Sequence, residues 1–255
     1  YNKALPHIKD DKLREDVQAF IRQEAIHARA HIKGQAYLQG HDCNIEPELQ
    51  RAKKLFGTLL SEKPLGIVPL KHKALEEYWL IFRVGVIAAI EHFTGVIGQW
   101  ALDHEETWKK NGANPEMSDL FLWHLAEEVE HRNVAFDLFQ HLLSNKAGFY
   151  LSRQVIMTAV FPIFIYFLVQ TAQSLAQQDS DQAVRKKAQV NILRMLIQLD
   201  RVARRDGNIP SLGFLTKSVV RWLSPNYHPE HEGNTEQALA YFARSKAVQS
   251  AKRAS

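Results

Sequence analysis

The sequence contains few cysteines, glycines and prolines. A single cysteine, Cys43, occurs in 255 residues, so an internal disulfide and a zinc site built from several thiolates are both excluded. One unpaired thiol also favours a reducing, cytoplasmic compartment. The 12 glycines and nine prolines fall between apolar, periodic stretches, a pattern typical of helices with short connections. Because no strand-like alternation with hairpin turns accompanies them, we expect an all-α protein.

The chain also lacks a strong excess of charge of either sign. It has 32 basic and 28 acidic residues, which gives a formal net charge of +4. No dense basic block with interleaved aromatic residues is present, so we expect no nucleic-acid partner. The most basic stretch, 185–187 together with Arg201, Arg204 and Arg205, is compatible with a solvated helix face or with contact to anionic lipid. With 45% hydrophobic residues, the chain can bury a large helical core.

Apolar periodicity and turn residues predict the helices and their grouping. Asn114 or Ser118 is the candidate N-cap of the fourth helix. The predicted helices are 10–38, 47–63, 70–110, 115–144, 181–205, 212–223 and 235–248, besides an apolar helix near 155–169. The predicted organisation is a helical bundle over 1–145, apolar and basic helices packed on it over 146–225, and a polar tail over 226–255.

The apolar run VIMTAVFPIFIYFLV, residues 155–169, has three interpretations. It is shorter than the roughly 20 residues that span a bilayer, and we expect Pro162 to interrupt it. A buried helix that covers a hydrophobic site is the first interpretation. The second is a monotopic membrane contact or a hydrophobic substrate channel, and a transmembrane span is the least favoured. The expected location is therefore cytoplasmic, with a peripheral position at the inner membrane as the alternative.

Three segments place acids and histidines at helical spacing. The first is FIRQEAIHARAH, in which residues three and four apart share one helix face. The second is a glutamate inside the apolar run IFRVGVIAAIEHFTGVIGQWAL, and the third is WHLAEEVEHRNVAFDLF. The candidate metal ligands in these segments are Glu24, His27, His31, Glu91, His124, Glu128 and His131. His31 and His124 lie one turn beyond the others, either as extra ligands or as partners that orient a carboxylate.

The order of these residues is typical of a dinuclear metal site. In di-iron carboxylate bundles, two helices each supply one Glu and two supply Glu-x-x-His, all pointing inward. The chain supplies Glu24-x-x-His27, then Glu91, then Glu128-x-x-His131, the last three members of that order. Surface salt-bridge ladders or core histidines are the alternative. A buried Glu91 would cost several kcal/mol without compensating charge, which a metal dication supplies.

No helix before the predicted helix 10–38, which carries Glu24, supplies the first Glu of that order. The chain begins at Tyr1 rather than at Met, so we expect the first ligand on a helix upstream of Tyr1. Glu127 and Glu77 are the alternatives within the chain.

The three segments resemble a bacterial family known as predicted metal-dependent hydrolases. The matching stretches are FIRQEAIHARAH, IEHFT and WHLAEEVEHRNVAFDLF. The resemblance covers about Leu13 to Leu143, with weaker likeness downstream through the apolar helix. Members of that family usually carry a Phe-Pro-x-Gly-Glu segment before the first motif, which this chain lacks. The resemblance implies a ferritin-like fold. It also implies that Glu24, His27, Glu91, Glu128 and His131 are ligands, with His31 and His124 as participants.

Carboxylate and imidazole donors without a thiolate suit iron or manganese. Our leading hypothesis is an O2-activating oxidase or oxygenase with two Fe ions, or with Mn or mixed Fe/Mn, in which Glu24, Glu91 and Glu128 shift between binding modes. It would need O2, an electron donor and a small or hydrophobic substrate, approaching along apolar walls such as Phe161–Val169. The alternatives are a dinuclear metal-dependent hydrolase and a non-catalytic, metal-storing or membrane-associated helical protein.

Overall fold

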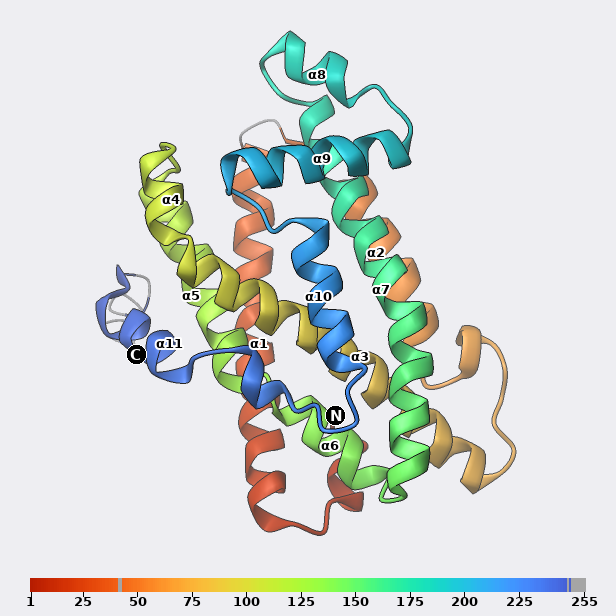
Figure 1. Ribbon diagram of the computed structural model, residues 1–255. Coiled ribbons are helices and arrows are strands. Elements are labelled where there is room, and N and C mark those ends of the chain that lie inside the picture. The colour runs from red at the N-terminus through yellow and green to blue at the C-terminus, as the bar shows by residue number, and fades with distance from the viewer. Residues whose placement is uncertain (41–42, 247, 249–255) are drawn as a thin grey trace. The chain divides into compact units, whose positions relative to one another are not determined.

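A computed structural model describes residues 1–40, 43–246 and 248, apart from the side chains of residues 33, 37 and 65. Within these residues the chain forms helices and no strand, so the predicted all-α class is confirmed (Figure 1). Short 3-10 turns occupy Leu5–His7, Pro64–Gly66 and Pro229–Glu232. The α-helices are α1 (Asp11–Gly40), α2 (Glu46–Leu59), α3 (Lys73–Asp103), α4 (Glu105–Lys110), α5 (Pro115–His131), α6 (Val134–Leu142), α7 (Lys146–Gln177), α8 (Gln182–Ala188), α9 (Ile192–Asp206), α10 (Leu212–Trp222) and α11 (Thr235–Arg244).

The predicted helix over 70–110 is two helices, α3 and α4, which meet at His104. The Nδ1 atom of His104 lies 2.7 Å from the carbonyl oxygen of Trp100, the acceptor that its own N–H would use in a continuing helix. That N–H donates to Ala101 instead, at 3.1 Å. The side chain therefore competes with the backbone for one carbonyl, and the helix ends there.

Two other predicted helices are also broken by side chains that bind backbone carbonyls. The predicted helix 115–144 separates into α5 and α6 at Arg132, whose guanidinium donates to the carbonyl of Val129. The predicted helix 181–205 separates into α8 and α9. There the Nε2 atom of Gln173, on α7, donates to the carbonyls of Ala188 at 2.9 Å and Val190 at 2.6 Å.

Three local predictions have clear outcomes. Asn114 is the N-cap of α5, because its side-chain oxygen accepts hydrogen bonds from the N–H groups of Glu116 and Met117, both at 3.0 Å. The expectation that Pro162 interrupts the apolar run is wrong, since Pro162 lies inside the 32-residue helix α7. The helix predicted over 235–248 ends at Arg244, and residues 249–255 of the predicted polar tail lie outside the described part of the chain.

The chain forms two compact units, each built from segments distant in sequence. Unit 1 comprises residues 1–86 and 138–197, and unit 2 comprises residues 87–137 and 198–255. In unit 1, α3 packs closely against α6 and α7. A Cβ atom added to Gly85 would lie 2.6 Å from the side chain of Ile156 and 2.8 Å from that of Phe139. In unit 2, α11 packs on α5, and the buried side chains of Trp100, Leu122, Val129, Ala238 and Tyr241 belong to one apolar cluster.

Two glycines bring α3 and α5 together in unit 2. A Cβ atom added to Gly98 would lie only 2.4 Å from the carbonyl oxygen of Leu125, and one added to Gly95 would lie 3.1 Å from Cβ of Arg132. Helices α3 and α5 therefore approach each other more closely than a side chain at these positions would permit, and this approach requires glycine. Gly95 and Gly98 follow Glu91 by four and seven residues, which places Glu91 on the face of α3 that meets α5.

Candidate metal site

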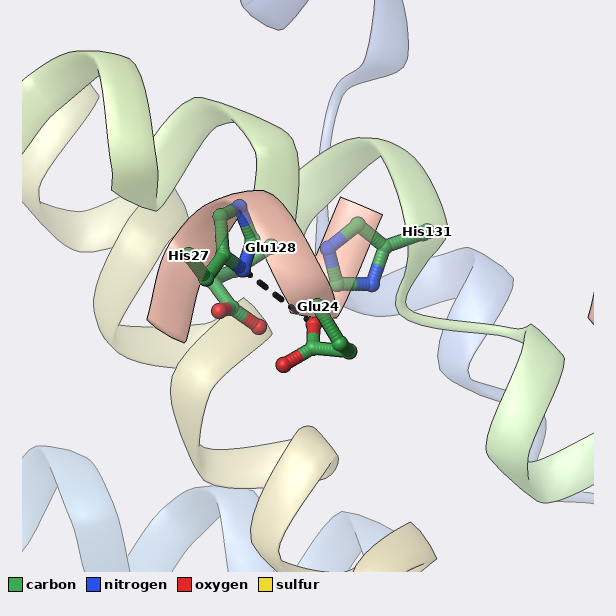
Figure 2. Close-up of side chains that lie close together, drawn as sticks. All are labelled: Glu24, His27, Glu128 and His131. Carbon is green, nitrogen blue, oxygen red and sulfur yellow. Dashed lines mark hydrogen bonds and ion pairs between the residues drawn. The ribbon is translucent and has the colours of Figure 1, made fainter. Parts of the chain in front are cut away.

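In unit 1, α1 presents the first Glu-x-x-His pair. The face of α1 that buries Val17 and Phe20 continues, at spacings of four and three residues, to Glu24 and His27. Oε1 of Glu24 lies 3.2 Å from Nδ1 of His27, an interaction drawn in Figure 2. His27 is buried, whereas the side chain of Glu24 is 38% exposed. The pair thus combines a fixed imidazole with a carboxylate that solvent can still reach.

His31 lies one turn beyond this pair on α1. It is more exposed than His27. Partial desolvation, and then the neighbouring imidazole of His27, lower the pKa of His31, while Glu24 acts in the opposite direction. The neutral imidazole is the form that binds metals, and this surrounding favours it. The assignment of His31 as a ligand stays a prediction.

In unit 2, α3 and α5 present two carboxylates and an imidazole. Glu91, Glu128 and His131 are all buried. Nδ1 of His131 lies 3.9 Å from Oε2 of Glu91. Figure 2 shows Glu128 and His131 on one helix, α5, with side chains one turn apart. Two carboxylates buried on facing helices can both stay ionised only beside compensating positive charge, which imidazolium or a metal dication can supply.

Thr94 links the two carboxylates of unit 2. Its hydroxyl donates to Oε2 of Glu128 at 2.9 Å and lies 3.5 Å from Oε2 of Glu91. Sequence reasoning missed this residue because it considered only acids and histidines. A signal was available, since Thr94 follows Glu91 by three residues and so shares its face of α3. A hydroxyl in this position orients a ligating carboxylate in the way that outer-shell partners do.

His124 and the two alternative acids lie at different places. Nε2 of His124, on α5, is 3.5 Å from Oε1 of Glu128, and its side chain is 23% exposed. This position suits either a ligand or an orienting partner, so both interpretations of His124 stay predictions. Glu127 is half-buried beside Glu128, whereas Glu77 is exposed in unit 1. The exposed position of Glu77 therefore does not support its assignment as a ligand of the buried site in unit 2.

His92, next to Glu91, is a buried anchor of α3. Its Nδ1 lies 2.7 Å from the hydroxyl of Tyr227, and its Nε2 lies 3.2 Å from that of Ser218. Because the Ser218 hydroxyl donates to the carbonyl of Leu215 at 2.8 Å, Nε2 donates to Ser218 and Nδ1 accepts from Tyr227. Burial, and secondarily Arg221, lower the pKa of His92 to about 3. The ring is therefore neutral and fixes the turn of α3 that carries Glu91.

The donor set fits a metal that prefers oxygen and nitrogen. In each Glu-x-x-His pair, a carboxylate oxygen and an imidazole nitrogen lie within 4.8 Å of each other. Two bonds of about 2.1 Å to one ion span at most about 4.2 Å, and the 3.2 Å between Glu24 and His27 lies within this limit. Carboxylates and imidazoles together suit manganese, iron or zinc.

The fold and these side chains define an all-α protein with a candidate carboxylate–imidazole metal site. The chain belongs to the family described as predicted metal-dependent hydrolases, whose model matches residues 1–233. The match is longer than the Leu13–Leu143 stretch expected from the motifs, and it ends before α11. No curated protein and no solved structure matches the chain significantly. The family description favours a metal-dependent hydrolase, our alternative, over the oxidase or oxygenase that we expected first.

Proposed function

We propose that this protein is a metal-dependent hydrolase with a dinuclear centre. The observation that carries the proposal is the convergence, in unit 2, of two buried carboxylates and a buried imidazole on facing helices. Burying such groups costs free energy of folding, so their presence here favours a bound cation or another functional role. The proposed ligands are Glu24, His27, Glu91, Glu128 and His131, with His31 and His124 as further candidates.

The pair on α1 and the groups on α3 and α5 are proposed to bind the same two ions. A Glu-x-x-His pair supplies only two protein donors, whereas a two-metal site needs more. The chain order Glu-x-x-His, Glu, Glu-x-x-His is the order in which di-iron carboxylate bundles use their inward-facing ligands. This order is the support for one shared centre.

Bound metals would lower the pKa of a coordinated water and would stabilise the charge that develops on an ester or phosphoester. The residues of the chain have separable roles in this proposal. Thr94 holds the carboxylate of Glu128 in one orientation. His124, the partly exposed imidazole beside Glu128, is placed to exchange a proton with solvent. Glu24, the more exposed carboxylate, is the ligand with most freedom to change its binding mode.

A second candidate function is O2 activation by a di-iron centre. Its support is that every proposed ligand is Glu or His in the order of di-iron proteins, without aspartate. This function would require O2 and an electron donor, as well as a small or hydrophobic substrate. The same ligands serve both functions, so only an assay of the reaction can distinguish the two functions.

Turnover of the metal-loaded chain separates the two functions. We expect the protein reconstituted with Mn²⁺, Zn²⁺ or Fe²⁺ to hydrolyse simple nitrophenyl esters or phosphoesters, with activity lost on chelation and restored by metal. Oxygen uptake by the anaerobically prepared ferrous protein, measured with an electrode, is the parallel assay. Rapid uptake with a new optical band, and no metal-dependent hydrolysis, would replace the hydrolase by the oxidase.

Histidine variants in the two units test whether one centre is shared. We expect His27→Ala and His131→Ala each to abolish most of the metal-dependent activity. The double variant should lose little more, because residues that act as a unit are strongly non-additive. His72→Ala, an exposed histidine, is the control. Two independent sites would instead give losses in metal content that simply add, as measured by elemental analysis.

A further inference from the structure

The exposed face of α7 is a continuous apolar stripe. Its members are exposed and follow one another at spacings of four, three, four and four residues, which places them on one side of the helix. Val155 is 69% exposed and Leu151 is 62% exposed. Within the stripe, the hydroxyl of Thr158 donates to the carbonyl of Val155 at 2.7 Å. The stripe consists of Leu151, Val155, Thr158, Pro162 and Tyr166.

The opposite face of α7 already forms the packed side of the helix. Phe149, Arg153, Ile156 and Val160 are buried there. Ile156 is the residue that packs against Gly85 of α3. A helix that is apolar all round is normally buried or in contact with lipid, yet the most apolar window of α7 is only 22% buried. The stripe therefore needs a covering surface that unit 1 does not supply.

Helix α3 is also long and apolar, but its burial in the protein accounts for its composition. By length and composition, two described helices, α3 and α7, can cross a membrane. The apolar window of α3 is 56% buried, and both of its glycine faces meet other helices, so core packing explains its composition. The same explanation does not extend to α7.

Helix α7 itself contributes no negative charge to the stripe. Between Asp137 and Asp179 the sequence contains no acidic residue. Beyond Tyr166, the line of the stripe continues through Val169 and Gln173, which are buried, and Gln173 is hydrogen-bonded to the end of α8. The exposed residues Lys186 and Lys187, in the last turn of α8, therefore lie about two turns of α7 beyond Tyr166.

We propose that this stripe, with the basic turn of α8 beside it, docks on the headgroup boundary of an anionic lipid bilayer. Apolar side chains bordered by lysines, with no carboxylate among them, match a surface that is apolar inside and negative outside. Tyr166 places an apolar ring and a polar hydroxyl at the edge of the stripe, as residues at membrane interfaces do. Pro162 has no N–H to donate to the carbonyl of Thr158. That polar group is tolerated where water reaches and is costly in the hydrocarbon core, so the proposed position is shallow.

Vesicle flotation with the full chain tests the proposal, which does not depend on the metal centre. Vesicles of phosphatidylcholine mixed with phosphatidylglycerol are compared with vesicles of phosphatidylcholine alone. We expect binding to the mixed vesicles that weakens as salt rises, and much weaker binding to the neutral ones. Replacing both Lys186 and Lys187 by Gln should weaken binding to mixed vesicles about thirtyfold, because each cation near the surface contributes roughly fivefold.

A second pair of variants tests the apolar part. Val155→Glu should weaken binding to mixed vesicles by at least about tenfold, because it places a charge within the apolar contact. Leu239→Glu, at an exposed leucine of α11 in unit 2, is the matched control and should bind as the parent does. Circular dichroism verifies that both variants fold. Equal binding by Val155→Glu and the parent chain would overturn the proposal.

A second copy of the chain is the competing occupant of the stripe. Sedimentation velocity without lipid distinguishes it, since we expect a monomer over the concentrations used for flotation. A dimer that dissociates in Val155→Glu, together with no binding to mixed vesicles, would overturn lipid docking in favour of self-association.

Discussion

Replacing Glu91 by glutamine is expected to abolish tight binding of one of two metal ions while leaving helix content unchanged. Glu91 is buried, faces His131 across 3.9 Å and shares the hydroxyl of Thr94 with Glu128. The amide keeps the shape of the side chain and removes its charge, so the loss is of a ligand rather than of packing. We expect the affinity to fall by more than the 10–100-fold typical of an outer-shell partner. Elemental analysis and equilibrium dialysis measure it.

The same substitution should change stability in opposite directions with and without metal. In the metal-free protein, Glu91→Gln removes a buried negative charge beside Glu128 and should raise the free energy of unfolding by about 1–2 kcal/mol. In the loaded protein, the lost ligand should lower the melting temperature, because metal bound only by the native state stabilises it. Thermal melts with metal and with chelator reveal this reversal.

Glu77→Gln is the matched control for Glu91→Gln. Glu77 lies on the same helix two heptads earlier and is exposed. We expect its substitution to leave metal content and melting temperature unchanged. Full metal content in Glu91→Gln would show that the ligand assignment is wrong. A fall in both variants alike would indicate general damage to α3.

The sequence was sufficient for the class of fold and for the local geometry of the candidate ligands. Helical spacing alone predicts that Glu24 and His27 share a face, and that Glu128 and His131 share another. In the structure, each pair is one turn apart on one helix. These predictions hold because they depend on backbone geometry within a single helix. How the two units combine around a metal stays a proposal.

The breaks between helices were not predictable from local pattern. The gap between α8 and α9 is stabilised by Gln173, which lies 15 residues before the carbonyl of Ala188 that it binds. The break after His131 involves Arg132, which has one local partner, the carbonyl of Val129, and several others about a hundred residues later. Local periodicity contains no information on such contacts. Thr94 was missed for a related reason, since its role depends on Glu128, a residue of another helix.

Replacing Arg132 by methionine is expected to destabilise unit 2 more than any surface substitution. The guanidinium is buried and donates to the carbonyls of Pro229 at 3.0 Å, Glu230 at 2.9 Å and Gly233 at 3.1 Å. It also donates to the hydroxyl of Thr235, the first residue of α11, at 3.0 Å. A carbonyl left buried without a donor costs about 1–3 kcal/mol. With several lost at once, we expect a fall of about 3–5 kcal/mol in the free energy of unfolding.

The damage from Arg132→Met should reach the metal centre through His131, its neighbour in the chain. Arg132 fixes the end of α5 against the segment that leads into α11, a helix that lies beyond the family match. Release of that segment frees the last turn of α5 and with it the imidazole. We therefore expect weaker metal binding as well as a melting temperature lower by roughly 10 °C, since 1 kcal/mol corresponds to about 2–4 °C at this size.

Arg204→Met is the control: Arg204 is exposed and paired with Asp200 at 2.8 Å, a contact worth less than about 1 kcal/mol. If Arg132→Met melts and binds metal as Arg204→Met does, the guanidinium is not what holds α5 in place, and the position of His131 must depend on the packing of Ala238 and Tyr241 alone.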